Sequence, residues 1–132
     1  MSIVFYRKHY NLNTCLTTII VSFDLSSTLI DAIYRNIGFA CEFGSTVLVD
    51  NGPTTRSFVT TNFKVLWGDS KPVLYVPFNQ TRGFGEACND GFSLCPPDLA
   101  VLLVNPDAQL TQGTIQRLLH AFVSWPRLGI VS

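Results

Sequence analysis

The sequence has little charge and no excess of either sign. Only 14% of its 132 residues are charged, and nine Lys and Arg residues balance nine Asp and Glu residues. A chain with no net positive field does not gather the phosphate backbone of a nucleic acid or the headgroups of anionic lipids. We therefore expect no nucleic-acid partner.

Long apolar runs are also absent. The runs around residues 19–21 and 99–104 fall far short of the roughly 20 residues that a membrane-spanning helix needs. Near the start of the chain, the basic residues follow an apolar patch, which is the wrong order for a secretory signal. We expect no transmembrane segment and a cytoplasmic protein.

Two common site patterns are missing. The four cysteines form no Cys-x-x-Cys pair, and His9 and His120 have no ligand-like spacing to them or to each other. Zinc ligands recur at short, regular spacings, so we expect reduced, mostly buried thiols rather than a zinc site. No Gly-Lys-Ser or Gly-Lys-Thr triplet occurs, which excludes a Walker phosphate loop.

What the chain does contain is material for one core. Its hydrophobic content is 47%, and its length corresponds to about one ordinary domain. We expect a single domain over residues 1–132, in which residues 1–16 form an irregular N-terminal extension.

Strand-like and helix-like segments alternate along the rest of the sequence. Helical spacing predicts helices at 25–39, ended by Gly38, and at 111–124, with Thr111 as N-cap. Residues 83–94 can form the helix that follows the third strand. Residues 53–72 are expected to form a short helix or irregular crossover. Such alternation predicts right-handed βαβ units, hence an α/β fold with three α/β/α layers and a mostly parallel sheet. The predicted strands are 17–23, 45–52, 72–78 and 98–107, followed by a short final strand at 128–132.

Polar residues follow each of the four main strands. They are Asp24, Asp50 with Asn51, Asn79, and Asn105 with Asp107. Ligands of parallel α/β sheets bind beyond the carboxyl ends of the strands. Asp and Asn also gather at strand ends as turn formers and helix caps, and for Asp107 the alternative role is to cap a following turn.

Asp107 and the Gly83-x-Gly85 pair are the main candidates for chemistry. The glycines match a dinucleotide fingerprint only in part, because Cys88 stands where a third small residue is wanted and the first strand does not precede them. Asp107 lies near the distance expected of a ribose-binding acid. Beside Asn105 and Pro106, it can also offer oxygen ligands to Mg²⁺ or Mn²⁺ bridging a diphosphate.

Five stretches together carry a family resemblance. The most specific parts are the pattern Asn-x-x-x-Gly-Phe-Gly-x-Ala-x-Asn-x-Gly from Asn79 to Gly91 and the Asn-Pro-Asp-Ala motif at 105–108. In order and spacing, residues 17–132 resemble the nucleotide-sugar-binding half of family 2 glycosyltransferases, especially the rhamnosyltransferase-like branch. The stretches are "VSFD", "VLVDNGPTT", "NQTRGFGEACNDGF", "VLLVNPDAQLTQGTIQRLLHAF" and "RLGIVS".

The resemblance implies a GT-A fold, truncated at its C-terminus, that binds a nucleotide-diphosphate sugar with Mg²⁺ or Mn²⁺. The sugar would pass with inversion to an acceptor hydroxyl in polysaccharide or glycan synthesis. Asp107 would be the metal-binding acid, and Asn89 would start the inner face of its helix. The implied nucleotide-sugar contacts are Ser22, Phe23, Asp24, Asp50, Asn51, Asn79, Gly83, Phe84, Gly85, Asn89 and Asn105.

The sequence also departs from the family. Pro53 and Thr55 replace the usual Ser and Asp, and the chain stops where the family continues into its acceptor half. No Asp or Glu follows Asp107, so the catalytic base has no assigned residue. The acceptor, a glycan or a lipid-linked sugar, stays unassigned, with peripheral association at the inner membrane face as one consequence.

Two other function classes remain open. One is a dinucleotide-binding oxidoreductase domain, and the other is a non-catalytic α/β binding or assembly module. An exposed sheet edge in place of the missing half would favour a homo-oligomer.

Overall fold

The computed structural model describes residues 3–6, 16–23, 27–52, 73–78, 80–97 and 99–125. The predictions for Asp24, Asn79, the crossover at 53–72 and the final strand lie outside these residues.

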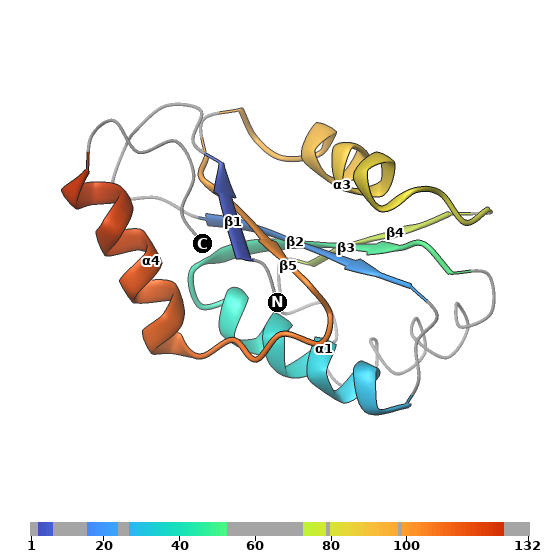
Figure 1. The fold of residues 1–132 in the computed structure, drawn as a ribbon, viewed down its shortest axis with the longest axis horizontal. Coiled ribbons are helices and arrows are strands. Elements are labelled where there is room, and N and C mark those ends of the chain that lie inside the picture. The colour runs from blue at the N-terminus through green and yellow to red at the C-terminus, as the bar shows by residue number, and fades with distance from the viewer. Residues whose placement is uncertain are drawn as a thin grey trace.

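A five-stranded sheet forms the centre of the molecule, in the order β1-β5-β2-β3-β4 (Figure 1). Strands β2, β3, β4 and β5 are mutually parallel, whereas β1 runs antiparallel to β5. The sheet is therefore mostly parallel, as predicted. The strands span Ile3–Tyr6 (β1), Leu16–Ser22 (β2), Gly44–Asp50 (β3), Val73–Pro77 (β4) and Val101–Val104 (β5).

The first strand corrects one expectation. Residues Ile3–Tyr6 pair in register with β5, with Ile3 opposite Val104 and Tyr6 opposite Val101. The prediction of an irregular N-terminal extension is thus wrong for this segment. Its short apolar run, "IVFY", suits a strand that covers the edge of β5.

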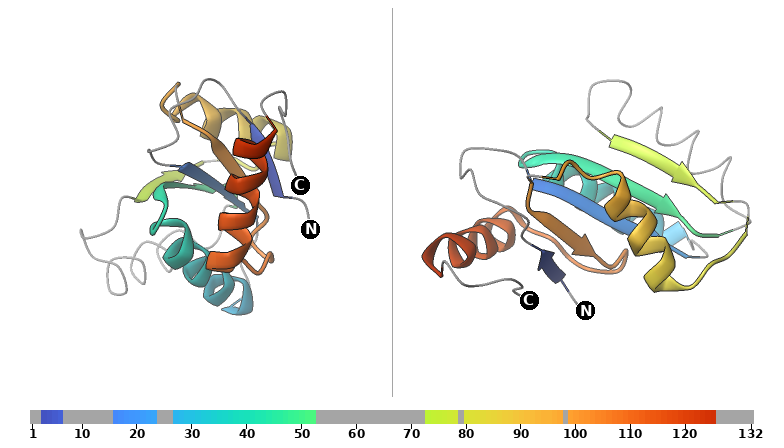
Figure 2. Two further views of the ribbon diagram at one scale, coloured as in Figure 1. Left: turned by 90° about the vertical axis from the view of Figure 1, so that its left-hand side faces the viewer. Right: turned by 90° about the horizontal axis from the view of Figure 1, so that it is seen from above.

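The helices lie on both faces of the sheet, which confirms the three-layer α/β/α arrangement (Figures 1 and 2). The connection from β2 to β3 and the one from β4 back to β5 run in opposite directions, so right-handed crossovers place their helices on opposite faces. Helices α1 and α4 cover one face and α3 covers the other. The helices span Ser27–Ala40 (α1), Phe84–Ser93 (α3) and Gln112–Ser124 (α4).

Strand β2 lies at the centre of the core, and all seven of its residues are buried. Alternate side chains reach opposite faces, so Ile20 packs with α1 and α4, whereas Ile19 and Val21 pack with α3. A β-branched strand buried on both faces is typical of a parallel sheet. The apolar stripe of α1 forms as predicted, but the helix runs through Gly38 and ends at Ala40.

The start of α4 and the packing of α3 on the sheet also follow from local chemistry. Thr111 caps α4 as predicted, because its hydroxyl accepts a hydrogen bond from the Thr114 N–H at 3.1 Å. Helix α3 packs closely on the sheet through buried Ala87 and Gly91. A Cβ at Gly91 would lie 2.8 Å from Cγ2 of Ile19, so this contact requires glycine.

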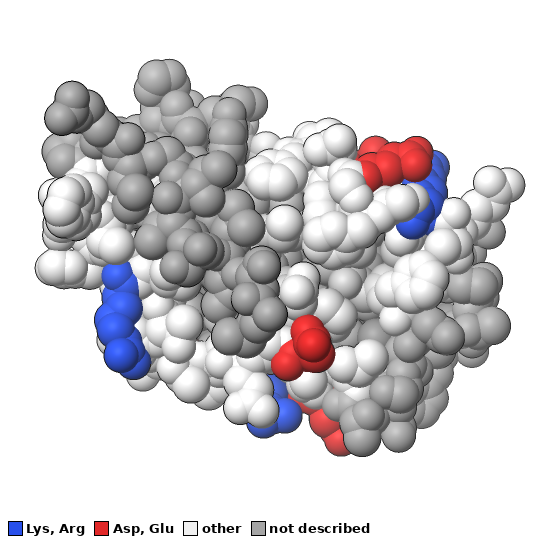
Figure 3. All heavy atoms as spheres, viewed as in Figure 1, with Lys and Arg blue, Asp and Glu red and all other residues white. Residues whose placement is uncertain are grey.

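The described part of the surface carries few charges. In Figure 3, acidic and basic side chains lie together over α3, and the other charged groups on that face are scattered. Among the described residues, no helix has both the length and the apolar character needed to cross a membrane.

Candidate functional site

The strand order identifies the candidate site at the carboxyl ends of the parallel strands, which is called the carboxyl edge of the sheet below. From β2 the parallel strands continue through β3 to β4 on one side, while β5 lies on the other side. The strand order therefore reverses between β2 and β5, and in open α/β sheets ligands bind beyond the carboxyl ends at such a reversal. Residues singled out in the sequence follow two of these strands: Asn51 follows β3, and Asn105 and Asp107 follow β5.

The segment after β5 carries Asn105 and Asp107. Val104 is in register with Ile20, so this segment leaves the sheet before β2 does. Asp107 is exposed and Asn105 is partly exposed. Within the described part of the chain, neither side chain makes a hydrogen bond or ion pair, so Asp107 does not cap the turn, which closes through Ala108 N–H donating to the Asn105 carbonyl at 3.0 Å.

Asn36 of α1 holds this segment from its buried side. Its Nδ2 donates to the Ala108 carbonyl at 2.8 Å, and its Oδ1 accepts from the Leu110 N–H at 3.0 Å. The side chain is 1% exposed. Sequence reasoning missed Asn36, and its only signal is a polar residue next to Ile37 on the apolar stripe of α1.

Asp50, at the end of β3, is turned into the fold. Its Oδ1 accepts from the Gly52 N–H at 3.1 Å, and its Oδ2 accepts from the Tyr75 hydroxyl at 2.5 Å. The residue is 1% exposed. Both oxygens of its carboxylate are thus engaged inside the protein.

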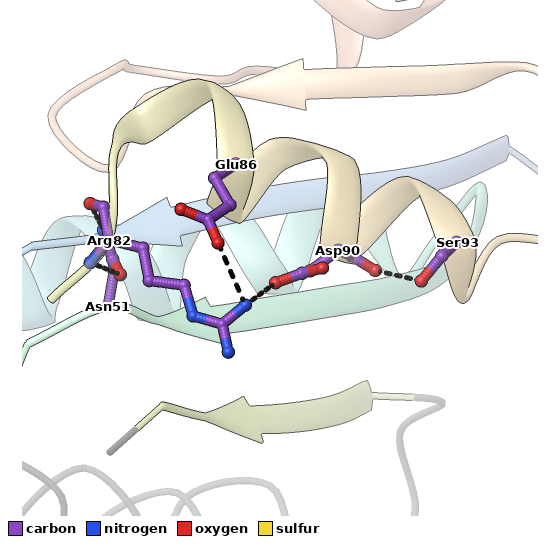
Figure 4. Close-up of polar contacts among 5 residues, drawn as sticks. All are labelled: Asn51, Arg82, Glu86, Asp90 and Ser93. Carbon is purple, nitrogen blue, oxygen red and sulfur yellow. Dashed lines mark hydrogen bonds and ion pairs between the residues drawn. The ribbon is translucent and has the colours of Figure 1, made fainter. Parts of the chain in front are cut away.

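Asn51 links the end of β3 to the turn before α3 (Figure 4). Its Nδ2 donates to the Arg82 carbonyl at 2.7 Å, and its Oδ1 accepts from the Arg82 N–H at 2.9 Å. Its own N–H donates to the Ser22 carbonyl at 2.9 Å. Buried Asn51 therefore fixes the turn to the ends of both β2 and β3, and buried Ser22 bonds through its hydroxyl to the Val49 carbonyl.

The Arg82 side chain runs along α3. Its Nη1 lies 2.6 Å from Oδ2 of Asp90 and 3.5 Å from Oε1 of Glu86, and its guanidinium carbon lies 4.4 Å from the centre of the Phe78 ring. Exposed ion pairs stabilise by less than about 1 kcal/mol, so these contacts mainly orient the turn (Figure 4).

The glycines after Arg82 lie in open space. A Cβ at Gly83 or at Gly85 would meet no atom within 4 Å, and Gly83 has φ −59° and ψ 146°, which any residue adopts. Packing and backbone conformation therefore do not explain glycine at Gly83. The aromatic rings beside this edge, Phe84 and Phe23, are 53% and 56% exposed.

Asn89 does not occupy its expected place. It is exposed, and the inner face of α3 is formed by Ala87, Cys88 and Gly91. The expectation that Asn89 starts that face is wrong. The asparagine lines a cavity described below.

The predicted residues thus form two groups. Ser22, Asn51 and the glycine turn are joined by hydrogen bonds, whereas Asn105 and Asp107 lie at the end of β5, on the other side of β2. Two strand spacings separate β3 from β5, roughly 10 Å. No hydrogen bond or ion pair joins the two groups within the described residues.

The oxygen donors at the β5 end fit a hard divalent cation. In proteins Mg²⁺ is usually held by one or two carboxylates, by substrate phosphates and by water. Asp107 supplies a carboxylate and Asn105 an amide oxygen, and neither group has a partner among the residues that the structure describes. The described residues contain no group of three or more His, Cys, Asp or Glu side chains that could hold a metal.

One cavity lies at the opposite end of the sheet. It has a volume of about 250 Å³ and lies between the end of α3 and the start of β5. Burial raises the pKa of the Cys95 thiol on its wall to about 11. The cavity contains none of the strand-end residues of the candidate site, and it is lined by Asn89, Phe92, Ser93, Cys95, Pro96, Pro97, Leu99 and Val101.

No protein-family model matches the chain, and no curated protein matches it significantly. The family resemblance of the motifs therefore stays a prediction.

Proposed function

We propose that this chain is the donor-binding part of a glycosyltransferase of GT-A type. It would bind a nucleotide-diphosphate sugar at the carboxyl edge of the sheet, with Mg²⁺ or Mn²⁺ at Asp107. The observation that carries the proposal is the carboxylate of Asp107, which has no partner among the described residues and is exposed at the end of β5 where the strand order reverses.

The other strand-end carboxylate is not used in the same way. Asp50 is engaged with Gly52 and Tyr75, so it contributes to the shape of the edge and not to a ligand. Asn51 likewise acts through the Arg82 backbone. Nucleotide contacts at this side of the site would come from the open glycine turn and the exposed rings of Phe23 and Phe84.

In this function the cation would neutralise charge on the leaving nucleoside diphosphate. Asp107 would bind the cation directly, and Asn105 would add an oxygen donor or a hydrogen bond to a phosphate. The glycine turn would let a phosphate or ribose approach the backbone without meeting a side chain. These roles cover donor binding, and the acceptor hydroxyl and its base are left unassigned.

The position of the glycine turn favours this proposal over an oxidoreductase. A dinucleotide fingerprint follows the strand next to the reversal of strand order, whereas Gly83 and Gly85 follow β4, which lies at the end of the strand order. Among the described residues, Cys88 and Cys95 form no disulfide, which is consistent with the cytoplasmic location that we propose.

Ligand-induced stabilisation tests the proposal. We expect UDP or TDP to raise the melting temperature only when Mn²⁺ or Mg²⁺ is present, because a ligand at about 100 times its Kd stabilises the folded state by about 2.7 kcal/mol. Asp107→Asn should weaken the metal-dependent binding at least about tenfold, or about 1.4 kcal/mol. Differential scanning fluorimetry measures both effects.

Glu42→Gln is the matched control. It removes one carboxylate charge from the exposed turn before β3, at the opposite edge of the sheet, and should leave the metal-dependent shift unchanged. Stabilisation by NAD in place of nucleoside diphosphates would favour the oxidoreductase, and no shift with either ligand would favour a binding module.

A further inference from the structure

The segment that carries Asn105 and Asp107 has a single side-chain anchor within the described residues. It leaves β5 and runs beside α1 toward α4 (Figure 1). The turn itself closes through one backbone hydrogen bond, from Ala108 N–H to the Asn105 carbonyl. Beyond the turn, Ala108 and Leu110 are buried in the core against α1.

Asn36 satisfies the backbone groups that this burial would otherwise leave without partners. It donates to the Ala108 carbonyl at 2.8 Å and accepts from the Leu110 N–H at 3.0 Å. A side-chain amide that bonds a carbonyl and an N–H two residues apart fixes both the position and the direction of the chain between them. The first of these groups is one residue from Asp107.

We propose that Asn36 is a positioning residue for the candidate cation site. It holds the 105–110 segment so that the Asp107 carboxylate faces outward at the carboxyl edge. The proposal rests on the proposed function, because it assigns Asn36 a purpose in cation binding as well as in folding. Within the described residues, the side chains of Asp107 and Asn105 make no hydrogen bond or ion pair of their own, so their placement depends on the backbone that Asn36 holds at Ala108 and Leu110.

A purely structural role would be shared by the neighbours of Asn36 on α1. Ile33 lies one turn earlier on the same stripe, is 2% exposed and packs in the same core. It makes no polar contact with the 105–110 segment. Ile33→Ala therefore loses core packing without loosening the anchor, which makes it a control for general destabilisation.

The experiment compares Mn²⁺ binding by electron paramagnetic resonance, in the presence of UDP, under conditions where circular dichroism shows each variant to be folded. We expect Asn36→Ala to weaken Mn²⁺ binding by about tenfold or more, and Ile33→Ala to change it less than about twofold. Asn36→Gln keeps an amide donor and an amide acceptor on a longer side chain, so it should lie between Asn36→Ala and the unaltered protein.

Two outcomes would overturn the proposal in distinguishable ways. Equal Mn²⁺ affinity in Asn36→Ala and Ile33→Ala would remove the positioning role while leaving the proposed function in place. No Mn²⁺ binding by the unaltered protein would overturn the proposed function and the role of Asn36 together. If Asn36→Ala does not fold, the same comparison is decided with Asn36→Gln.

Discussion

At the scale of single residues, Asn36 and Asn51 have the same structural role in two parts of the fold. Both are almost completely buried, and in each the amide oxygen and nitrogen bond the backbone of a segment distant in sequence. A buried amide left without partners would cost about 1–3 kcal/mol. Each asparagine therefore stabilises a single conformation of the loop to which it is hydrogen-bonded.

The glycines of α3 allow a prediction at this scale. Gly91→Ala should lower the free energy of unfolding by about 1–3 kcal/mol, because the new methyl group would lie 2.8 Å from Cγ2 of Ile19 and 3.3 Å from Cγ2 of Val49. Both neighbours are buried and cannot move aside. Urea unfolding followed by circular dichroism measures the change.

Gly85→Ala is the matched substitution on the same helix. No atom lies within 4 Å of a Cβ there, so the change should stabilise the protein by about 0.5–1 kcal/mol through helix propensity. Equal effects of the two substitutions would contradict the close packing of α3 on the sheet.

At the scale of elements, the end of α3 makes stability depend on pH. Burial raises the pKa of Cys95 from 9.0 to about 11, so the folded state holds the thiol proton more tightly than the unfolded state. The stabilisation from this group is full below about pH 9 and is lost as the pH rises toward about 11.

The measurement is the free energy of unfolding of the unaltered protein and of Cys95→Ala across this range. Burial also raises the pKa values of Cys88 and Tyr34, and their contributions cancel in the difference between the two proteins. That difference should shrink as the pH rises from about 8 to about 11. A constant difference would mean that the Cys95 thiol titrates equally in both states.

Element types could be read from the sequence more reliably than element bounds. The helical repeat of apolar residues predicted α1 and α4, because burial of one face imposes that repeat. Mostly apolar runs predicted the parallel strands, and α3 was placed as the helix that follows the third of them. The fourth strand was predicted at residues 98–107, whereas β5 spans Val101–Val104. The sequence pattern also missed β1, since a four-residue strand has too few residues to establish an alternation.

At the scale of the whole molecule, the sequence predicted the edge of the candidate site but not the state of its side chains. Residues at strand ends share an edge in any parallel sheet, so Asp50 and Asp107 could be placed there together. Which carboxylate turns inward depends on partners in other elements. Tyr75 of β4 engages Asp50, and only the folded chain brings these two residues into contact.

The antiparallel strand β1 gives a prediction for the whole sheet. Removal of residues 1–6 would expose the backbone edge of β5, where Ile3–Tyr6 now pair with Val101–Val104. An unpaired strand edge is a template for another chain. We expect the shortened protein to unfold at lower urea concentration and to self-associate, as measured by size-exclusion chromatography with light scattering at several protein concentrations.

A shortened protein that stays monomeric at every concentration and unfolds at the same urea concentration would show that β1 does not protect the sheet. The chain with residues 1–6 in place, measured under the same conditions, provides the reference for both measurements.

Because of the two buried asparagines, the fold does not depend on the exposed residues that would contact a ligand. A buried asparagine holds each loop from the side that faces the core. The exposed residues Phe84 and Gln109 therefore do not contribute to core packing. Substitutions there can accumulate during evolution without loss of the scaffold. An edge built in this way can change the molecule it recognises while the protein keeps its shape.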